Sequence, residues 1–388
     1  RGLSGKLGRP FGRSESQKRA ELMELQTVGS KYQGFIYRRQ PRNVYWETTI
    51  SCDLACQHCR ASAIPHRDPA ELSTEQGKAL MRSVQELGSM LVLTGGDPLK
   101  RPDIAELIEY GRSLPIHVAI TPSTTPLLRR ETVDRFHELG VSAMGVSLDG
   151  PTAETHDAFR NVPGTFEYSM RALQWAREFD IPVQVNTTIT AKTLPHVQAM
   201  YELLRDKAAP PVRRWSLFLL IPVGRGAELD TPSADDVEKL FEWVYTISSE
   251  APFRVGTTEA PHYRRYWIQQ KLREGMSAEA VQARARQMAF GIRDGNGVIF
   301  VSHLGEVYPA GFLPYPLLGN VKEQPLHEIY RESEALHEIQ DPRNYRGRCG
   351  RCEFKFACGG SRARAYAMTG DPLGEDPLCA YQPGPEPA

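Results

Sequence analysis

The chain has 388 residues, of which 40% are hydrophobic and 24% charged, and its 47 Lys and Arg residues balance its 47 Asp and Glu residues. This length predicts one large domain with an appendage. Without a net basic charge, neither nucleic acid nor an anionic membrane is expected as a partner. The apolar runs are far shorter than the roughly 20 residues of a membrane span, and no secretory signal is recognisable, so a cytoplasmic protein is expected.

The predicted elements begin after residues 1–42, which are basic, weakly periodic and expected to be a partly ordered leader. Short β-type runs then alternate with amphipathic stretches. Strands are expected at residues 44–50, 90–93, 117–121, 143–148, 182–189 and 215–221. Helices are expected at residues 74–87, 103–112, 131–139, 165–179, 194–205 and 234–248. Ser73 and Gln76 have the spacing of a capping box at the first of these helices.

Six strand–helix units in series predict an α/β fold with parallel strands and helices outside them. Six units are too few for an eight-stranded barrel, which leaves a partial barrel or a doubly wound sheet. In both folds ligands bind at the C-terminal ends of the strands.

After about residue 250 the pattern changes. A strand is expected at residues 253–258, then a long polar helical region, a hairpin of 298–301 with 306–308, and a helix at 326–339. We therefore predict a first domain over residues 43–250 and a smaller cysteine-rich domain over residues 251–388.

The seven cysteines form two tight groups that are far apart in the sequence. They are Cys52, Cys56 and Cys59 in the first group, and Cys349, Cys352, Cys358 and Cys379 in the second. An odd number of thiols at short spacings in a long chain favours metal coordination over a disulfide framework.

The first group has the spacing C-x3-C-x2-C directly after a predicted strand. Thiolates bind both iron–sulfur clusters and zinc. Structural zinc takes four protein ligands, and His58, flanked by two cysteines, would have difficulty reaching the same ion. On a cubane cluster, three thiolates leave one iron open to a small molecule. A zinc knuckle or three unrelated thiols are the alternatives.

This loop, from Cys52 to Cys59, resembles the signature of the radical S-adenosylmethionine (radical SAM) superfamily. The resemblance implies a partial barrel of six units, which agrees with the strand count. It also implies a 4Fe–4S cluster on the three cysteines, whose open iron binds SAM. Reductive cleavage of SAM gives a 5′-deoxyadenosyl radical that abstracts hydrogen from the substrate. His58 occupies the position whose side chain commonly packs near adenine.

Further motifs follow the later strands. Thr94-Gly95-Gly96-Asp97-Pro98 resembles the family's GGEP motif, which holds the SAM amino group, with Asp97 in place of Glu. Without that context, the same residues would indicate an ordinary turn. The resemblance implies further SAM contacts from Ser147, Asp149 and Val223, although a turn with a buried Asp cap is the alternative for the first two. Asn186 is expected to face the barrel interior, where a polar side chain usually binds a ligand, and Arg160 is a further candidate. Arg160 would suit a carboxylate, although a solvated surface arginine is the alternative.

Four C-terminal thiolates saturate either zinc or a 4Fe–4S cluster. Beside the first motif they resemble the auxiliary-cluster region called SPASM, or its shortened Twitch form. Two thiols of a full SPASM domain are missing, because Ala310 and Arg362 stand in their places. We therefore predict one auxiliary 4Fe–4S cluster, fully ligated by protein, that transfers electrons or positions the substrate.

Residues 59–63, 161–164, 222–226 and 359–365 resemble the haem-biosynthesis branch of the superfamily, whose members make haem b by an alternative route or make haem d1. That branch acts on porphyrin propionates. In residues 258–266, arginines are expected to pair with propionates, His262 to bind iron or donate a proton, and Tyr263 to relay one. The alternative is an ordinary helix N-terminus with solvated charges.

The leading hypothesis is therefore a radical SAM oxidoreductase or lyase that acts on propionates of an iron porphyrin. A low-potential donor such as ferredoxin or flavodoxin would supply the electron for SAM cleavage. A second hypothesis is the modification of a ribosomally made peptide. A third is a non-enzymatic zinc-binding interaction protein that uses both cysteine groups structurally.

Overall fold

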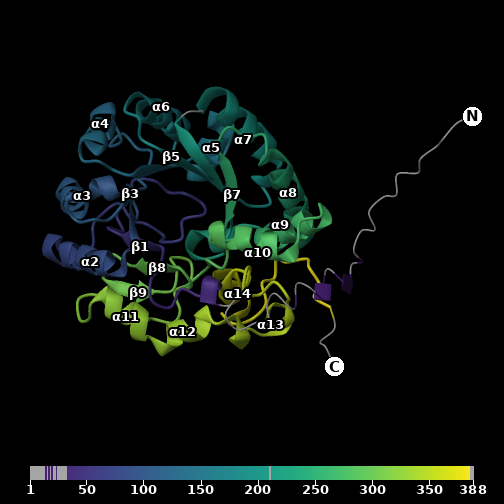
Figure 1. Ribbon diagram of the computed structural model, residues 1–388. Coiled ribbons are helices and arrows are strands. Elements are labelled where there is room, and N and C mark those ends of the chain that lie inside the picture. The colour runs from purple at the N-terminus through teal and green to yellow at the C-terminus, as the bar shows by residue number, and fades with distance from the viewer. Residues whose placement is uncertain are drawn as a thin grey trace, which may run out of the picture.

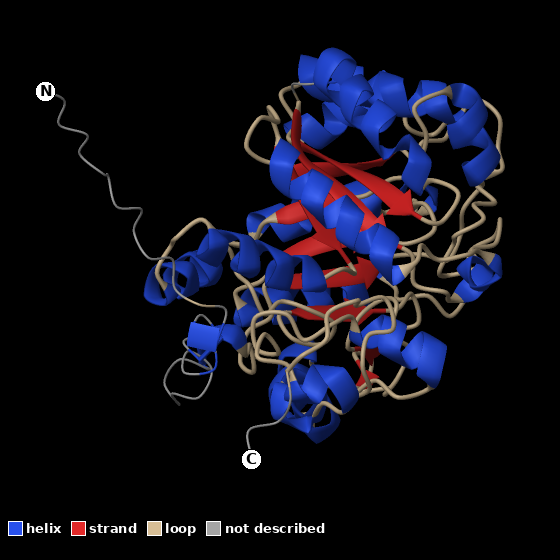
Figure 2. Ribbon diagram, turned by 90° about the vertical axis from the view of Figure 1, so that its right-hand side faces the viewer, coloured by secondary structure: helices blue, strands red, loops and turns tan. Residues whose placement is uncertain are grey.

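The computed structural model describes residues 33–208 and 211–384, together with residues 14, 16, 17, 19, 20 and 23. Most of the expected leader lies outside the described residues. The centre of the molecule is a single ten-stranded sheet (Figures 1 and 2). Its strands are β1 (Asn43–Glu47), β2 (Met90–Thr94), β3 (Val118–Ile120), β4 (Ala143–Ser147), β5 (Val183–Ile189), β6 (Val212–Leu219), β7 (Arg254–Thr258), β8 (Val298–Val301), β9 (Glu306–Tyr308) and β10 (Gly319–Asn320).

The strand order is β10-β9-β8-β1-β2-β3-β4-β5-β6-β7, and all neighbours from β8 to β7 are parallel. From β1 to β7 each strand lies beside the next one in sequence. A doubly wound sheet would reverse its order at a switch point, so this order is that of an open, partial barrel. The hairpin predicted over residues 298–308 is present as β8 and β9.

The predicted domain boundary near residue 250 does not interrupt the sheet. β7 pairs with β6 at one end, while β8 pairs with β1 on the side opposite to β2. The C-terminal part of the chain therefore extends the barrel sheet at both ends. In the view of Figure 1 its last helices, α13 and α14, lie below α10.

The helices are α2 (Thr74–Leu87), α3 (Ile104–Ser113), α4 (Arg130–Glu138), α5 (Ala153–Arg160), α6 (Thr165–Glu178), α7 (Val197–Leu203), α8 (Ala234–Ile247), α9 (His262–Arg273), α10 (Ala278–Gln287), α11 (Leu326–Glu332), α12 (Glu334–Gln340), α13 (Gly347–Arg351) and α14 (Arg362–Thr369). The predicted capping box is present, because Ser73 and Gln76 exchange hydrogen bonds at the start of α2. The helix expected over residues 326–339 is two helices, because Ser333 has extended backbone and caps the second. None of the described helices is long and apolar enough to cross a bilayer.

Alternation along the strands defines two faces of the sheet. Val44, Trp46, Leu91 and Leu93 belong to the main apolar core, which is shared with helices such as α2. Side chains at the intervening positions point to the opposite side, which we call the inner face. Tyr45 and Glu47 of β1 lie on the inner face, beneath the loop that follows this strand.

Candidate active site and C-terminal cysteine site

The loop that contains the first three cysteines follows β1, at the C-terminal end of the parallel strands. Cys52 and Cys56 are buried, whereas Cys59 is half-buried. The Leu54 amide donates to the Cys52 sulfur at 3.4 Å. Burial raises the pKa of Cys52, and the neighbouring Cys56 raises it further. Neighbouring thiols that interact electrostatically are stable as thiolates only where a cation neutralises them, so the donor set fits a thiolate-bound metal cluster.

The residues after β6 hold this loop in place. The Arg225 amide donates to the Cys59 carbonyl at 3.0 Å, and its guanidinium donates to the carbonyls of Cys56 at 2.9 Å and Ala63 at 3.2 Å. Gly224 has a φ of +55°, and a Cβ atom there would lie 2.3 Å from the Arg60 carbonyl oxygen. Only glycine permits this approach without displacing the cysteine loop.

An ion pair at the end of β4 touches the second cysteine. The Arg160 guanidinium donates to Asp149 Oδ2 at 2.7 Å and to the Cys56 sulfur at 3.6 Å. Burial raises the pKa of Asp149, but Arg160, the two nearby histidines and the Thr188 amide together outweigh burial and lower that pKa to about 2. The Thr188 amide also donates to Asp149 Oδ1 at 2.7 Å. The carboxylate that binds Arg160 in this structure is that of Asp149. Through Arg160, the last residue of α5, this ion pair also contacts the cysteine loop.

The glycine motif after β2 packs directly against the start of the cysteine loop. A Cβ atom on Gly96 would lie 2.3 Å from the Ser51 carbonyl oxygen, and one on Gly95 would lie 2.5 Å from that of Thr49. The Asp97 side chain is fully buried and accepts hydrogen bonds from Leu99, Ser123 and Thr125. Burial raises the pKa of Asp97 to about 6. Asp97 therefore braces the loop after β3 with its carboxylate.

His58 lies within the cysteine loop and stacks on Phe159 of α5, with ring centroids 4.5 Å apart. Burial, followed by the charge of Arg160, lowers the pKa of His58 to about 3, so its ring is neutral at physiological pH. Its Nδ1 is buried and has no hydrogen-bond partner among the described residues. An unpaired polar atom at this position fits the predicted contact with a bound nucleotide.

The remaining predicted SAM residues lie at the ends of β4, β5 and β6. The Ser147 carbonyl accepts a hydrogen bond from Ser169 at 3.0 Å. Asn186 lies on the inner face and accepts from Gln184 at 2.8 Å. Val223 directly precedes the glycine that approaches the cysteine loop. Their roles toward SAM stay predictions.

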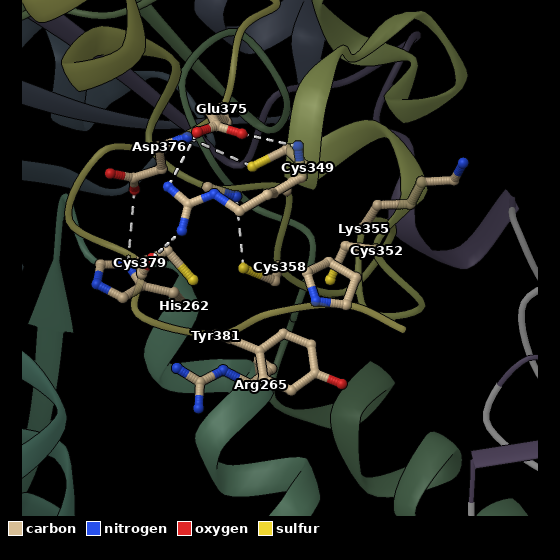
Figure 3. A pocket seen from close by; sticks show the side chains of 14 residues that line it. His262, Arg265, Cys349, Cys352, Lys355, Cys358, Glu375, Asp376, Cys379 and Tyr381 are labelled. Carbon is tan, nitrogen blue, oxygen red and sulfur yellow. Dashed lines mark hydrogen bonds and ion pairs between the residues drawn. The ribbon is translucent and has the colours of Figure 1, made fainter. Parts of the chain in front are cut away.

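The four C-terminal cysteines line one small cavity (Figure 3). Burial, followed by the charge of the neighbouring thiols, raises the pKa of Cys358 to about 12 and that of Cys352 well above its usual range. Gly360 has a φ of +65°, and a Cβ atom there would lie 3.1 Å from the Cys349 sulfur. Four thiols that line one cavity and interact electrostatically fit a metal cluster with four cysteine ligands.

Arg362 lies beside this cavity, at one of the two positions where the resemblance to a full SPASM domain predicts a thiol. Its guanidinium donates to the Cys349 sulfur at 3.6 Å and to the Pro372 carbonyl at 3.1 Å, and it lies over the Tyr345 ring at 4.4 Å. Ala310, at the other such position, is buried in an apolar cluster. A cation and a methyl group thus stand at the two positions where that resemblance predicts thiols.

The structure separates the predicted substrate residues of the 258–266 segment. His262 is fully buried and lines the C-terminal cavity, with Nδ1 3.6 Å from Asp376 Oδ2. Tyr263 instead packs against Phe241 of α8, and burial raises its pKa to about 12. Arg265 pairs with Glu238. Helix α9 begins at His262 and turns successive side chains in different directions, so Arg265 lines the same cavity as His262 whereas Tyr263 faces α8; the roles of His262 and Tyr263 toward a substrate stay predictions.

Within the described residues, no three His, Cys, Asp or Glu side chains lie close enough together to bind a single metal ion. A cubane cluster binds each thiolate at a different iron, so its cysteine ligands need not lie as close together as the ligands of a single ion.

Sequence reasoning missed a charged group beneath the cysteine loop. Glu47, the last residue of β1, is buried and pairs with Arg60. His303, in the turn after β8, also binds Glu47, with 2.6 Å between Nδ1 and Oε1. Arg60 lies over the Phe300 ring at 4.6 Å. The sequence does show an acidic residue, Glu47, within a predicted strand. It does not show the partners of Glu47, because they come from other segments of the chain.

Comparison with known proteins agrees with this arrangement. The family model for the radical SAM superfamily matches residues 46–204. The chain is 39% identical to the AdoMet-dependent heme synthase of Methanosarcina barkeri, over 89% of this chain and 97% of that protein. It is 31% identical to the Fe-coproporphyrin III synthase of the same organism, over 87% of each chain.

Among solved structures, SuiB of Streptococcus suis bound to S-adenosylmethionine superposes with a TM-score of 0.69 over 95% of this chain and 88% of that one. At 16% identity, this likeness supports the fold alone. The family assignment makes the chain an enzyme, so the hypothesis of a non-enzymatic zinc protein is wrong. The chain belongs to the radical SAM superfamily, whose members use a 4Fe–4S cluster and S-adenosylmethionine, and within it to the group that contains the AdoMet-dependent heme synthases.

Proposed function

We propose that this enzyme oxidatively decarboxylates propionate side chains of an iron porphyrin, as a cytoplasmic step of haem biosynthesis. The observation that carries the proposal is the match to an AdoMet-dependent heme synthase over almost the full length of both chains. The two cysteine sites agree with it, because the reaction needs a source of radicals and an acceptor for one electron.

Cys52, Cys56 and Cys59 would hold the first cluster. When bound, this cluster and SAM supply a radical that removes one hydrogen atom from the substrate. The propionate then loses one electron and carbon dioxide, and a vinyl group remains. Arg225 fixes the carbonyls of the cysteine loop during this chemistry, and Phe159 fixes the orientation of the His58 ring beside it.

Cys349, Cys352, Cys358 and Cys379 would hold a second, auxiliary 4Fe–4S cluster. A cluster there would supply an acceptor for the electron that leaves the substrate. Arg362 would stabilise it through a hydrogen bond to the Cys349 sulfur. A low-potential protein such as ferredoxin or flavodoxin would deliver the electron that starts the reaction.

The test is anaerobic reconstitution of the full chain, followed by incubation with SAM, reductant and iron coproporphyrin. We expect about eight irons per chain and a product that has lost one carbon dioxide and two hydrogens per propionate. One molecule of 5′-deoxyadenosine should accompany each decarboxylation.

A variant with Cys349 and Cys358 changed to Ser separates the two sites. It should retain about four irons and cleave SAM but form little vinyl product. Cleavage of SAM by the wild-type enzyme with no change in the porphyrin would reject this substrate, and zinc without iron would reject the cluster chemistry.

A further inference from the structure

A β-bulge in β6 turns an arginine onto the inner face of the sheet. Val183 and Gln184 are consecutive on β5, yet they pair with Val212 and Arg214 of β6, which leaves Arg213 as the extra residue. Val212 belongs to the main core, as does Trp215. Without the bulge, Arg214 would share the face of Val212; with it, Arg214 points to the inner face.

A second arginine lies beside the first. Arg254 of β7 is the register partner of Arg214, so both side chains project from the same face of neighbouring parallel strands. Both are exposed. Gly256, the next inner-face position of β7, makes room for Arg214, since a Cβ atom there would lie 3.2 Å from Arg214 Nη2. Tyr45, on the inner face of β1, is close enough to interact electrostatically with Arg214.

These two guanidinium groups repel each other without a counter-ion. Neighbouring protein atoms partly desolvate the Arg214 guanidinium and lower its pKa, and the charge of Arg254 lowers it further. No ion pair joins either arginine to a carboxylate in the part of the chain that the structure describes. Like charges at paired positions of a sheet are destabilising, so the placement of both arginines on one inner face points to an anionic ligand.

The inner face between these arginines and the cysteine loop carries aromatic rings. Phe218 lies four residues beyond Arg214 on β6 and contacts Phe312, with centroids 5.1 Å apart. Phe300, on the inner face of β8, lies under Arg60. From Arg214 to the end of β6 at Leu219 is roughly 16 Å. A ligand that spans this distance would contact apolar rings along its length and two guanidinium groups at its far end.

We propose that Arg214 and Arg254 bind a carboxylate of the substrate, a propionate of the iron porphyrin, at the end of the inner face that lies away from the cysteine loop. The inference rests on the proposed function and extends it. The anchored propionate is not the one that reacts. Its role is to hold the macrocycle against Phe218 and Phe312, so that a propionate on the opposite edge reaches the C-terminal ends of the strands. Paired guanidinium groups suit a carboxylate because each offers two parallel N–H donors.

The experiment measures binding of iron coproporphyrin to the reconstituted enzyme by its visible absorption. We expect the R214Q/R254Q double variant to bind at least about tenfold more weakly than wild type, which is a loss of about 1.4 kcal/mol. The tetramethyl ester of the same porphyrin, which has no carboxylates, should bind wild type and variant alike. R213Q, which removes the neighbouring exposed arginine of the bulge, should bind the free acid as wild type does.

A charge reversal separates ligand binding from stability. In R254E, the new carboxylate pairs with Arg214, so the free energy of unfolding should hold or rise while affinity for the free acid falls. Unchanged affinity in both R214Q/R254Q and R254E would overturn the anchor and leave the proposed function standing. Failure of the wild-type enzyme to bind the porphyrin at all would reject the proposed function and this inference together.

Discussion

Glu47 and His303 lie 256 residues apart and share a hydrogen bond of 2.6 Å at the junction of β1 and β8. Glu47 also pairs with Arg60, which directly follows the third cysteine. One buried carboxylate therefore joins the cysteine loop to the C-terminal part of the chain. A substitution of Glu47 or His303 should therefore destabilise both the cysteine loop and the C-terminal part of the chain.

The first prediction concerns the pH dependence of this contact. Burial alone would lower the pKa of His303, but Glu47 outweighs it and raises that pKa. Stabilisation by His303 is therefore complete below its unfolded pKa of about 6.5 and is lost as the pH rises through the higher folded value. For Glu47, burial would raise the pKa, but Arg60 and His303 lower it, so its contribution is lost as the pH falls below about 4.5.

The contact should thus stabilise most between about pH 4.5 and 6.5. H303Q should cost about 2 kcal/mol in urea unfolding within this range and clearly less at alkaline pH. H66Q, which changes an exposed histidine, is the control for the substitution itself and should cost less than about 0.5 kcal/mol. An equal loss for H303Q at acidic and alkaline pH would contradict the prediction.

The second prediction concerns Arg160. R160M leaves the Asp149 carboxylate buried without its guanidinium partner, which should cost about 3–5 kcal/mol. R171M breaks an exposed pair with Glu167 and should cost less than about 1 kcal/mol. The double variant D149N/R160M should recover part of the loss, because no buried charge is left unpaired. Similar losses for R160M and R171M would count against this account.

The third prediction concerns the cysteine loop. R225K loses the planar fork that reaches both the Cys56 and Ala63 carbonyls. After reconstitution it should retain about four irons per chain, those of the C-terminal site, in place of about eight. R205K, at an exposed pair with Asp206, is the control. Iron and sulfide assays decide the outcome, and full iron content in R225K would show that the loop does not need this residue.

The fourth prediction concerns Arg362. R362M removes a cation and an N–H donor from the Cys349 sulfur. Because both stabilise the reduced, more negative cluster, the reduction potential of the C-terminal cluster should fall by tens of millivolts. Redox titration followed by electron paramagnetic resonance measures it. R346M, which removes an exposed arginine that pairs with Asp371, should leave the potential as it is.

The regular elements could be predicted because their signals are local. Apolar periodicity placed the helix over residues 74–87, and its capping residues, Ser73 and Gln76, are near in sequence. Cysteine spacing likewise identified both sets of thiols. The sixth strand was predicted to begin at Trp215 and in fact begins at Val212. Its first residues form a bulge that turns Arg214 inward, and no residue type in this segment indicates a bulge.

The side-chain partners at the site could not be predicted, because they depend on long-range contacts. Nothing near Glu47 in the sequence indicates His303, and nothing near Arg160 indicates Cys56. His262 and Tyr263 were expected to act together on one substrate. They diverge because consecutive residues of a helix point about 100° apart, which places one at the C-terminal cysteines and the other against α8.

The position of β1 has a consequence for biosynthesis of the chain. One edge of β1 pairs with β2. The other edge stays unpaired until β8 has been translated, and the residues of β8 are among the last of the sheet to be made. A nascent or truncated chain that ends before β8 exposes a central strand with apolar neighbours, which is an open template for aggregation. Helices can form early because their contacts join residues that are near in sequence. Pairing of β1 with β8 is a late and slow event, because these two strands are far apart along the polypeptide.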